Sequence, residues 1–319
     1  MVSDLESLVA ALGPHREPSL IDPAMQRALD EQGYVVVEVM PREDALALAQ
    51  EIAAQMPDEV TPNQDEAHWY HGLLDPDEKR GLATARLVWR GVMEGVYERF
   101  LTQARCQWAS VAVKPAGAPP TPLHHHWAST LDPFAQRLVC WTMLSPGTDT
   151  SQRFQLVPKS HQLIRFIRAK GSTDYFHDFS QTLMERHAID IKIDAGSAII
   201  FEDSLLHAVS ANAGLSDRIA AIATFVGADM PSAYFEMRDK GNFSVHVSEK
   251  CDPFPDYLTN GDRIFGSRDV VEFRNANRKL TLKEFETLVS LGGKASLSHN
   301  PLDQLCHSEH HTQESFASQ

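Results

Sequence analysis

The chain has 319 residues, 43% of them hydrophobic, and a formal net charge of −14 with an isoelectric point near 5.5. It can bury one large core or two modest ones, and its acidic surface, which lacks a clustered Lys/Arg stripe, argues against a nucleic-acid partner. The four cysteines form no Cys-x-x-Cys pair, no run has the roughly 18 apolar residues of a membrane span, and the N-terminus lacks a signal-peptide pattern, so we expect a soluble cytoplasmic protein.

The first third of the chain predicts helices around one strand. Residues 24–32 fit a short helix that ends at Gly33, and residues 34–39 (YVVVEV) are a β-branched run typical of a strand. Apolar residues recur at helical spacing over residues 42–56, which predicts an amphipathic helix packed on a sheet. Residues 57–104 combine a polar, aromatic loop with a second helical region, and we interpret them as an insert.

Short apolar strands dominate the chain after this insert, and turns rich in Pro, Gly, Asp and Asn separate them. The expected strands cover residues 108–115, 137–144, 154–160, 189–193, 196–202 and 218–226. This pattern predicts a mostly β, double-sheet fold that helices of the N-terminal half buttress on one side.

The C-terminal part predicts one more helix and then a tail. Thr281 and Glu284 form a capping box for the helix LKEFETLVSL, and Gly292 lies where a glycine would end that helix. We expect residues 1–300 to form a single domain and the polar residues 301–319 to be a disordered tail.

Three consecutive histidines, His124, His125 and His126, lie in the middle of the chain. In a strand, His124 and His126 would point to one face and could share a metal ion, whereas His125 would point away. We therefore expect His125 to face outward or to support the metal ligands from behind. The alternative is that the run is only a polar loop, and the run alone favours neither interpretation.

A second segment bears on this choice. His207 follows an apolar strand and has apolar neighbours, and a histidine in such a place is by itself more often a core residue than a ligand. Arg218 heads a strongly apolar strand, where a buried guanidinium needs an anionic partner such as a carboxylate. An internal salt bridge explains Arg218 equally well until His207 is considered with it.

Several short motifs also follow one another in an informative order. Gly33–Val37 reads GYVVV, Lys114-Pro115 ends a strand, Pro158 to His161 reads PKSH, and Gly196 to Arg218 contains a Gly, Phe, His, Asn and Arg in sequence. In this order and spacing, over roughly residues 25 to 230, the chain resembles the phytanoyl-CoA dioxygenase family of iron(II)/2-oxoglutarate oxygenases.

The resemblance implies a double-stranded β-helix (jelly-roll, cupin-like) core, iron(II) bound by two histidines and a carboxylate, and 2-oxoglutarate and O₂ as co-substrates. Carried over, His124 and His207 are the two metal-binding histidines, and Arg218 holds the distal carboxylate of 2-oxoglutarate. His126 stands where the family has aspartate. The expected metal site is therefore formed by His124, His126 and His207, and Asp132 lies too far along the chain to replace the missing carboxylate.

The same resemblance suggests residues for the two ligand-binding walls. Lys114 and Thr142 are candidates for binding 2-oxoglutarate. The aromatic candidates for the substrate pocket are Trp127, Trp141, Trp108, Trp69 and Tyr70, although aromatic residues in this number more often pack in cores or loops. Residues 57–100 and 227–275 are the expected lids, because loops over a rigid β core carry specificity.

Three interpretations of the function remain. The first is an oxygenase that uses iron(II) and 2-oxoglutarate to hydroxylate or desaturate a C–H bond of a small molecule. Arg218 favours it, because a clamp for a dicarboxylate is otherwise unexplained. The second is a three-histidine dioxygenase in which the substrate itself chelates iron and 2-oxoglutarate is not used. The third is a non-catalytic member of the fold.

Overall fold

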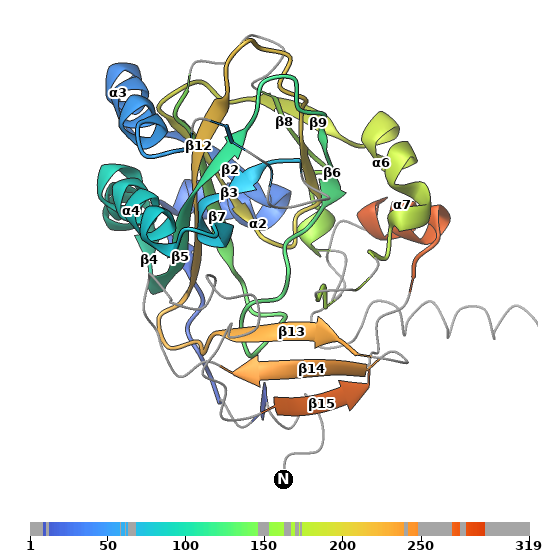
Figure 1. The fold of residues 1–319 in the computed structure, drawn as a ribbon. Helices are drawn as coiled ribbons and strands as arrows, with labels where there is room; N and C mark the ends of the chain where they lie inside the picture. Colours follow the sequence, from blue (N-terminus) through green and yellow to red (C-terminus); the bar gives the residue numbers. More distant parts are fainter. Residues whose placement is uncertain are drawn as a thin grey trace, which may run out of the picture.

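Two antiparallel sheets face each other at the centre of the computed structural model, and helices cover their outer faces (Figure 1). The structure describes residues 9–10, 13–57, 59–60, 62, 68–145, 153–162, 167–169, 172, 174–238, 242–247, 270–274 and 279–290. Apolar side chains from both sheets form one shared inner core. This arrangement is the expected jelly roll, so the predicted fold class is confirmed.

The larger sheet has six strands, and every neighbouring pair in it is antiparallel. Its order is β2 (Tyr34–Glu38), β10 (Ser197–Glu202), β7 (Leu138–Met143), β12 (Arg218–Gly227), β5 (Ala104–Lys114) and β3 (Tyr70–His71). The central strands are rich in Ala, Val and Ile and are buried along nearly their whole length, because one face meets the helices and the other meets the second sheet.

The smaller sheet has four strands, also antiparallel. Its order is β6 (Thr121–His124), β11 (His207–Val209), β8 (Arg153–Leu156) and β9 (Ile189–Lys192). A two-stranded ribbon joins β1 (Ser19–Leu20) to β4 (Leu101–Thr102).

Helices from the N-terminal half cover the outer face of the larger sheet. They are α2 (Pro23–Gln32), α3 (Arg42–Ala53), α4 (Glu78–Val88), the π-helical turn Trp89–Met93 and α5 (Glu94–Phe100). In Figure 1 α3 and α4 lie on one side of the barrel, whereas α6 (Ser180–Arg186) and α7 (Leu282–Ser290) lie on the other, against the smaller sheet. Short 3₁₀ turns cover Gly72–Leu74, Ser160–Gln162 and His177–Phe179. No helix in the described part of the chain is long and apolar enough to cross a membrane.

The ends of two helices follow the sequence signals. The Asp22 carboxylate accepts hydrogen bonds from the first amides of α2, and Gly33 ends that helix in the left-handed conformation, with φ of 88°. At α7, the Thr281 amide donates to the Glu284 carboxylate at 2.7 Å and the Glu284 amide donates to the Thr281 hydroxyl at 3.3 Å, which confirms the capping box.

The structure differs from the sequence expectations in two places: one strand is shorter than predicted, and one sheet was not predicted. The predicted strand 154–160 ends at Leu156, because Lys159 adopts a positive φ of 66° and a 3₁₀ turn begins at Ser160. The region 227–275, expected to form a lid over the β core, contains a third sheet of β13 (Ala233–Met237), β14 (Asn242–Val247) and β15 (Val270–Arg274). Gly292 and the predicted tail 301–319 lie outside the described residues.

Candidate metal centre

A β-bulge shapes the first part of the site. Strand β6 pairs with β11 through His124 opposite His207 and Thr121 opposite Val209, so two residues separate the pairs on β6 but only one on β11. The extra residue changes the alternation, and both Thr121 and His124 point into the barrel while Leu123 packs outward. Bulges are often found beside active sites, because they re-aim one side chain without disturbing the sheet.

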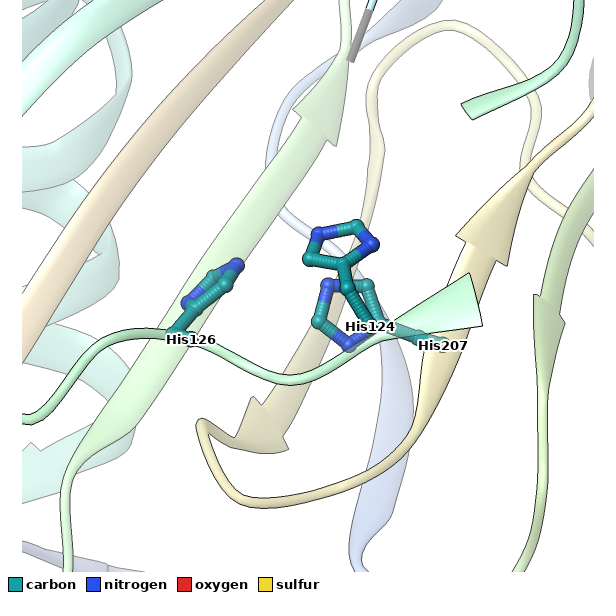
Figure 2. Close-up of side chains that lie close together, drawn as sticks. All are labelled: His124, His126 and His207. Carbon is teal, nitrogen blue, oxygen red and sulfur yellow. The ribbon is translucent and has the colours of Figure 1, made fainter. Parts of the chain in front are cut away.

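Three histidine side chains come together at this bulge, as Figure 2 shows. His124 ends β6, His126 lies in the loop after it, and His207 begins β11. One nitrogen from each ring can be chosen so that all three lie within 4.8 Å of one another. The ring centroids are 4.2 Å apart for His124 and His207 and 4.8 Å apart for His126 and His207.

Backbone carbonyls hold two of these rings in the tautomer that a metal needs. The Nδ1 atom of His124 lies 2.8 Å from the Pro122 carbonyl oxygen, and the Nδ1 atom of His207 lies 2.8 Å from the Leu205 carbonyl oxygen. A carbonyl oxygen only accepts, so each Nδ1 carries the proton and each Nε2 keeps its lone pair. These two rings are thus prepared to ligate through Nε2.

Electrostatics keep the three rings neutral. Burial lowers the pKa of His207 to about 4 and holds the pKa values of His124 and His126 well below the ordinary value, with the neighbouring histidines and Arg168 acting in the same direction. Neutral imidazole is the form that binds a metal ion, and three such donors suit iron, zinc, copper or nickel. The residues present therefore fit a divalent metal.

Aromatic rings form an apolar wall behind the histidines. Phe154 stacks on His207 with ring centroids 5.3 Å apart and planes 7° from parallel, and Phe201 contacts His207 at 4.8 Å. Trp141 continues the wall through a 5.7 Å contact with Phe154. Such a wall excludes water and fixes the ring of His207.

No carboxylate joins the histidine cluster among the described residues. Asp203 is buried and forms an ion pair with Arg137, and its backbone carbonyl accepts the His126 N–H at 2.9 Å. Asp132 lies 3.8 Å from His15 instead. The carboxylates nearest in sequence are therefore used elsewhere, which agrees with the expected three-histidine set.

His125 points away from the other two histidines of the run, and of the two expected positions, facing outward or lying behind the metal ligands, the structure shows the second. Its side chain is 5% exposed and packs against the rings of Tyr175 and Phe176, because α6, α7 and the segment before α6 cover this face of the smaller sheet. Its Nδ1 atom lies 3.7 Å from a carboxylate oxygen of Asp174. His125 is thus a buried group behind the cluster.

Arg168 and Asp174, which the sequence analysis did not identify, brace the histidine loop. The Arg168 guanidinium donates to the His125 carbonyl, and its Nε lies 3.0 Å from Asp174. The Arg168 carbonyl accepts the Ala128 N–H at 2.9 Å. The two contacts with the histidine loop join residues 40 and 43 positions apart in sequence, so no local pattern could have revealed them.

Two cations face a pocket between the sheets, on the six-stranded side. Arg218, the first residue of β12, is the register partner of Lys114, the last residue of β5, and both are buried. The Lys114 ammonium donates to the Thr121 hydroxyl at 3.0 Å, and the Arg218 guanidinium donates to the Ser210 carbonyl at 3.0 Å. The pocket is lined by Trp69, Ala112, Lys114, Thr121, Trp141, Val209, Arg218 and Ala220.

The pocket is electropositive, because these eight lining residues include two cations and no acid. Burial lowers the pKa of Lys114 to about 7, with Arg218 acting in the same direction, and burial lowers the pKa of Arg218 to about 10. An anionic ligand would relieve both effects. Asn212 supports the pocket from outside, since its amide donates to the carbonyls of Lys114, Pro115 and Ser216.

The structure separates the other predicted site residues. Trp69 and Trp141 line the cationic pocket. Thr142 does not, because it follows Trp141 on β7 and so faces the helices, where its hydroxyl lies 3.7 Å from the Cys140 sulfur. Successive residues of a strand point to opposite faces, so Thr142 points away from the pocket that Trp141 lines, and the expectation that Thr142 contacts the co-substrate is wrong.

Two aromatic candidates also lie away from the cationic pocket. The Tyr70 ring packs in the outer core, and its hydroxyl donates to Asp75, which Arg80 also binds. Trp127 is 47% exposed on the loop after the histidines.

Comparisons with known proteins give a family match and a fold. A family model described as phytanoyl-CoA dioxygenase (PhyH) matches residues 29–220, a span that contains every residue of the histidine cluster and both cations. No curated protein matches the chain.

Among solved structures, the chain is similar to the non-haem alpha-ketoglutarate-dependent carbocyclase SnoK from nogalamycin biosynthesis. The TM-score is 0.50 and the identity 19%, over 67% of this chain and 86% of that one. The similarity to HygX from Streptomyces hygroscopicus, solved with nickel and 2-oxoglutarate bound, has a TM-score of 0.46 and 11% identity over 65% and 88% of the chains. At 19% identity the first likeness supports the fold alone.

Proposed function

The chain belongs to the phytanoyl-CoA dioxygenase family, and on that basis we propose that it is a non-haem iron(II) oxygenase that uses 2-oxoglutarate and O₂ to hydroxylate or desaturate a C–H bond of a small molecule. One observation carries the proposal: three neutral imidazoles lie beside a pocket with two buried cations, and both groups face the space between the same two sheets. Neither group alone would distinguish an oxygenase from a simple metal-binding protein.

His124, His126 and His207 would hold the metal through one nitrogen each. Bound iron would supply the activation of O₂, coupled to conversion of 2-oxoglutarate to succinate and CO₂. The protein orients the ligands: the carbonyls of Pro122 and Leu205 fix the proton on Nδ1 of His124 and His207. Such fixed donors bind metal without reorganisation.

Arg218 and Lys114 would hold the distal carboxylate of 2-oxoglutarate. A guanidinium forms two parallel hydrogen bonds with a carboxylate, and an ammonium adds a point charge. Trp141 links the two parts of the site, because its side chain lines the cationic pocket and its ring contacts Phe154, which stacks on His207. The co-substrate can therefore span from the cations to the metal along an apolar wall.

Charge balance supports a dianionic co-substrate. Three neutral imidazoles leave the full 2+ charge on iron(II), whereas a ligand set with one carboxylate leaves 1+. The two charges of 2-oxoglutarate would neutralise the metal, and the buried cations add further attraction for it. A neutral co-substrate would leave this positive charge uncompensated.

Anaerobic titration of the iron(II)-loaded protein with 2-oxoglutarate tests the proposal. Bidentate binding of the co-substrate produces a visible metal-to-ligand charge-transfer band. We expect the band in the wild type, and we expect Arg218→Ala to weaken 2-oxoglutarate binding about tenfold to a hundredfold, since hydrogen bonds to charged groups contribute roughly 1.5–3 kcal/mol. Arg153→Ala is the matched control, because Arg153 forms an ion pair with Asp190 at a half-exposed position on β8.

The second candidate function is a three-histidine dioxygenase that binds its substrate directly to iron and does not use 2-oxoglutarate. The lack of a carboxylate in the described cluster favours it. Tight iron binding without a charge-transfer band and without any effect of Arg218→Ala would support this second function and exclude the first. The buried thiols of Cys106 and Cys140 support a reducing compartment, and we place the enzyme in the cytoplasm.

A further inference from the structure

The inner face of the larger sheet has two chemically different ends. Lys114 and Arg218 lie at one end and provide the cationic pocket. Trp108 also points inward from β5, and it lies six positions before Lys114. Six residues of a strand span about 20 Å, so Trp108 belongs to the opposite end of the barrel.

Trp108 is part of a row of four side chains that crosses the sheet. Strand pairing places Phe201 opposite Val139, Val139 opposite Thr224, and Thr224 opposite Trp108. Phe201 and Val139 belong to the inner core, Trp108 packs against it, and Thr224 lies between Ala223 and Phe225, which both face the helices. All four side chains of the row therefore face the interior of the barrel.

One end of this row touches the candidate metal site. The Phe201 ring centroid lies 4.8 Å from that of His207 and 5.8 Å from that of His126. The loop that follows His126 then reaches the other end of the row. There the Gln107 amide donates to the Ser129 carbonyl at 2.6 Å, and the Ser129 hydroxyl donates to the Gln107 side chain at 2.9 Å.

Gln107 is the extra residue of a bulge in β5. Thr224 pairs with Trp108 and Phe225 pairs with Cys106, so Gln107 has no partner on β12 and its side chain is directed to the loop. The loop from His126 to Ser129 thus runs from the metal site to the neighbour of Trp108. A molecule bound between this loop and the row would contact both the metal site and Trp108.

Two polar groups in the row are placed to bind such a molecule. The Thr224 side chain belongs to a residue that is only 3% exposed, and its hydroxyl has no hydrogen bond to any residue that the structure describes. Among the inward side chains of the central strands β7, β12 and β5, Trp108 and Arg105 are half-buried and the others are buried. The Thr224 hydroxyl can therefore offer a ligand oxygen or N–H a hydrogen bond worth about 0.5–1.5 kcal/mol.

We propose that Trp108 and Thr224 bind the substrate of this oxygenase, and that the substrate is an uncharged molecule with an apolar ring and a hydroxyl or carbonyl oxygen. The inference rests on the proposed function. The indole takes the ring, and the Thr224 hydroxyl takes the oxygen. No side chain of the row carries a charge, and Arg105, the next inward residue of β5, already donates to the Met230 carbonyl and the Ser232 hydroxyl. An uncharged substrate group is therefore favoured here. The two cations at the other end remain for 2-oxoglutarate.

The test uses 2-naphthol as a neutral ring probe and 2-naphthoate as its anionic counterpart. Both are titrated by ligand-observed NMR into the full chain loaded with cobalt(II) and 2-oxoglutarate without oxygen. We expect 2-naphthol to bind more tightly than 2-naphthoate, and its protons to relax faster with paramagnetic cobalt(II) than with zinc(II), since the row begins at the metal site. Trp108→Ala should weaken 2-naphthol binding about tenfold and Thr224→Val about fivefold. Tyr97→Ala, which removes a partly exposed aromatic ring on α5 over the outer face of the larger sheet, should leave it unchanged.

Equal binding by Trp108→Ala and the wild type, tighter binding of 2-naphthoate, or no binding of 2-naphthol would overturn the inference. Trp108→Phe keeps a ring in place if the alanine variant does not fold, and it should retain most of the affinity. The response of the cobalt(II) spectrum to 2-oxoglutarate is recorded in the same samples. A normal response with Trp108-independent probe binding rejects the substrate site alone, whereas no response rejects the proposed oxygenase.

Discussion

The two sheets of the barrel contribute different chemical groups to the site and hold those groups in place in different ways. The four-stranded sheet and its loop supply three neutral imidazoles, and the six-stranded sheet supplies Lys114 and Arg218. Lys114 is the last residue of β5 and Arg218 is the first residue of β12, and these two long strands pair over ten positions of β12. His124 and His207 lie on two short strands that share only two register pairs and a bulge, and His126 lies in the loop after the first of them. The anion pocket is therefore held by regular pairing, and the metal site needs support from outside its sheet.

That support is visible on both sides of the histidine loop. Arg168 binds the His125 carbonyl on one side, and the Asp203 carbonyl binds the His126 amide on the other. Both braces are ion-paired in turn, with Asp174 and Arg137 respectively. We call the histidine cluster and its supporting residues the metal half of the site, and Lys114 and Arg218 with their pocket the anion half. We expect substitutions of the residues that support the histidine loop to lower metal affinity, and substitutions in the anion half to lower only the affinity for 2-oxoglutarate.

Removing a ligand should have the largest effect. His207→Ala takes away the most buried of the three donors, and we expect cobalt(II) affinity to fall by more than about a hundredfold, beyond the losses typical of outer-shell changes. The visible cobalt(II) ligand-field spectrum measures the affinity. His187→Ala is the control, because His187 contacts Glu286 on the outer surface. Cobalt(II) bound as tightly by His207→Ala as by the wild type would show that the metal lies elsewhere.

Removing a brace should have a smaller effect of the same kind. Arg168→Ala leaves all three ligands in place but frees the backbone between His124 and His126, and we expect cobalt(II) affinity to fall about tenfold, at the lower end of outer-shell effects. The 2-oxoglutarate affinity of the metal-loaded protein should change far less, because Lys114 and Arg218 lie on the other sheet.

Arg153→Ala serves as the matched control for this brace, since it removes an arginine that is also ion-paired to an aspartate but lies at an exposed position on β8. Unchanged cobalt(II) affinity in Arg168→Ala, with the loss confined to thermal stability, would mean that the brace is structural only and that the histidine loop holds its shape unaided.

Local signals in the sequence were sufficient for much of the fold. β-branched runs located the long strands, and the Thr281–Glu284 capping box located the start of α7. The short strands β6 and β11 carry too few residues to show a period. The strands β13 to β15, within the expected lid region, were not predicted.

The predicted residues of the site divide in the same way. The order of His124, His126, His207 and Arg218 identified residues that the fold brings to one barrel interior. The prediction for Thr142 failed on strand alternation, which depends on register rather than residue type. Arg168 was missed as a site residue, because only the folded chain places it beside the histidine loop.

The smallest expected effect concerns pH and the anion half. Burial lowers the pKa of Lys114 to about 7, so in the empty pocket this ammonium loses its proton as the pH rises through that value. Only the protonated form attracts 2-oxoglutarate, so its affinity should fall several-fold between about pH 6 and pH 8.5, as expected for a group that titrates near pH 7. Arg218 keeps its charge in this range, because burial lowers its pKa only to about 10. Lys114→Met should bind more weakly at pH 6 and should lose this pH dependence, as measured by calorimetry on the zinc(II)-loaded protein. If Lys114→Met left the pH dependence of 2-oxoglutarate affinity unchanged, the titrating group would belong to the metal half, and the two sheets would not have the separate roles described above.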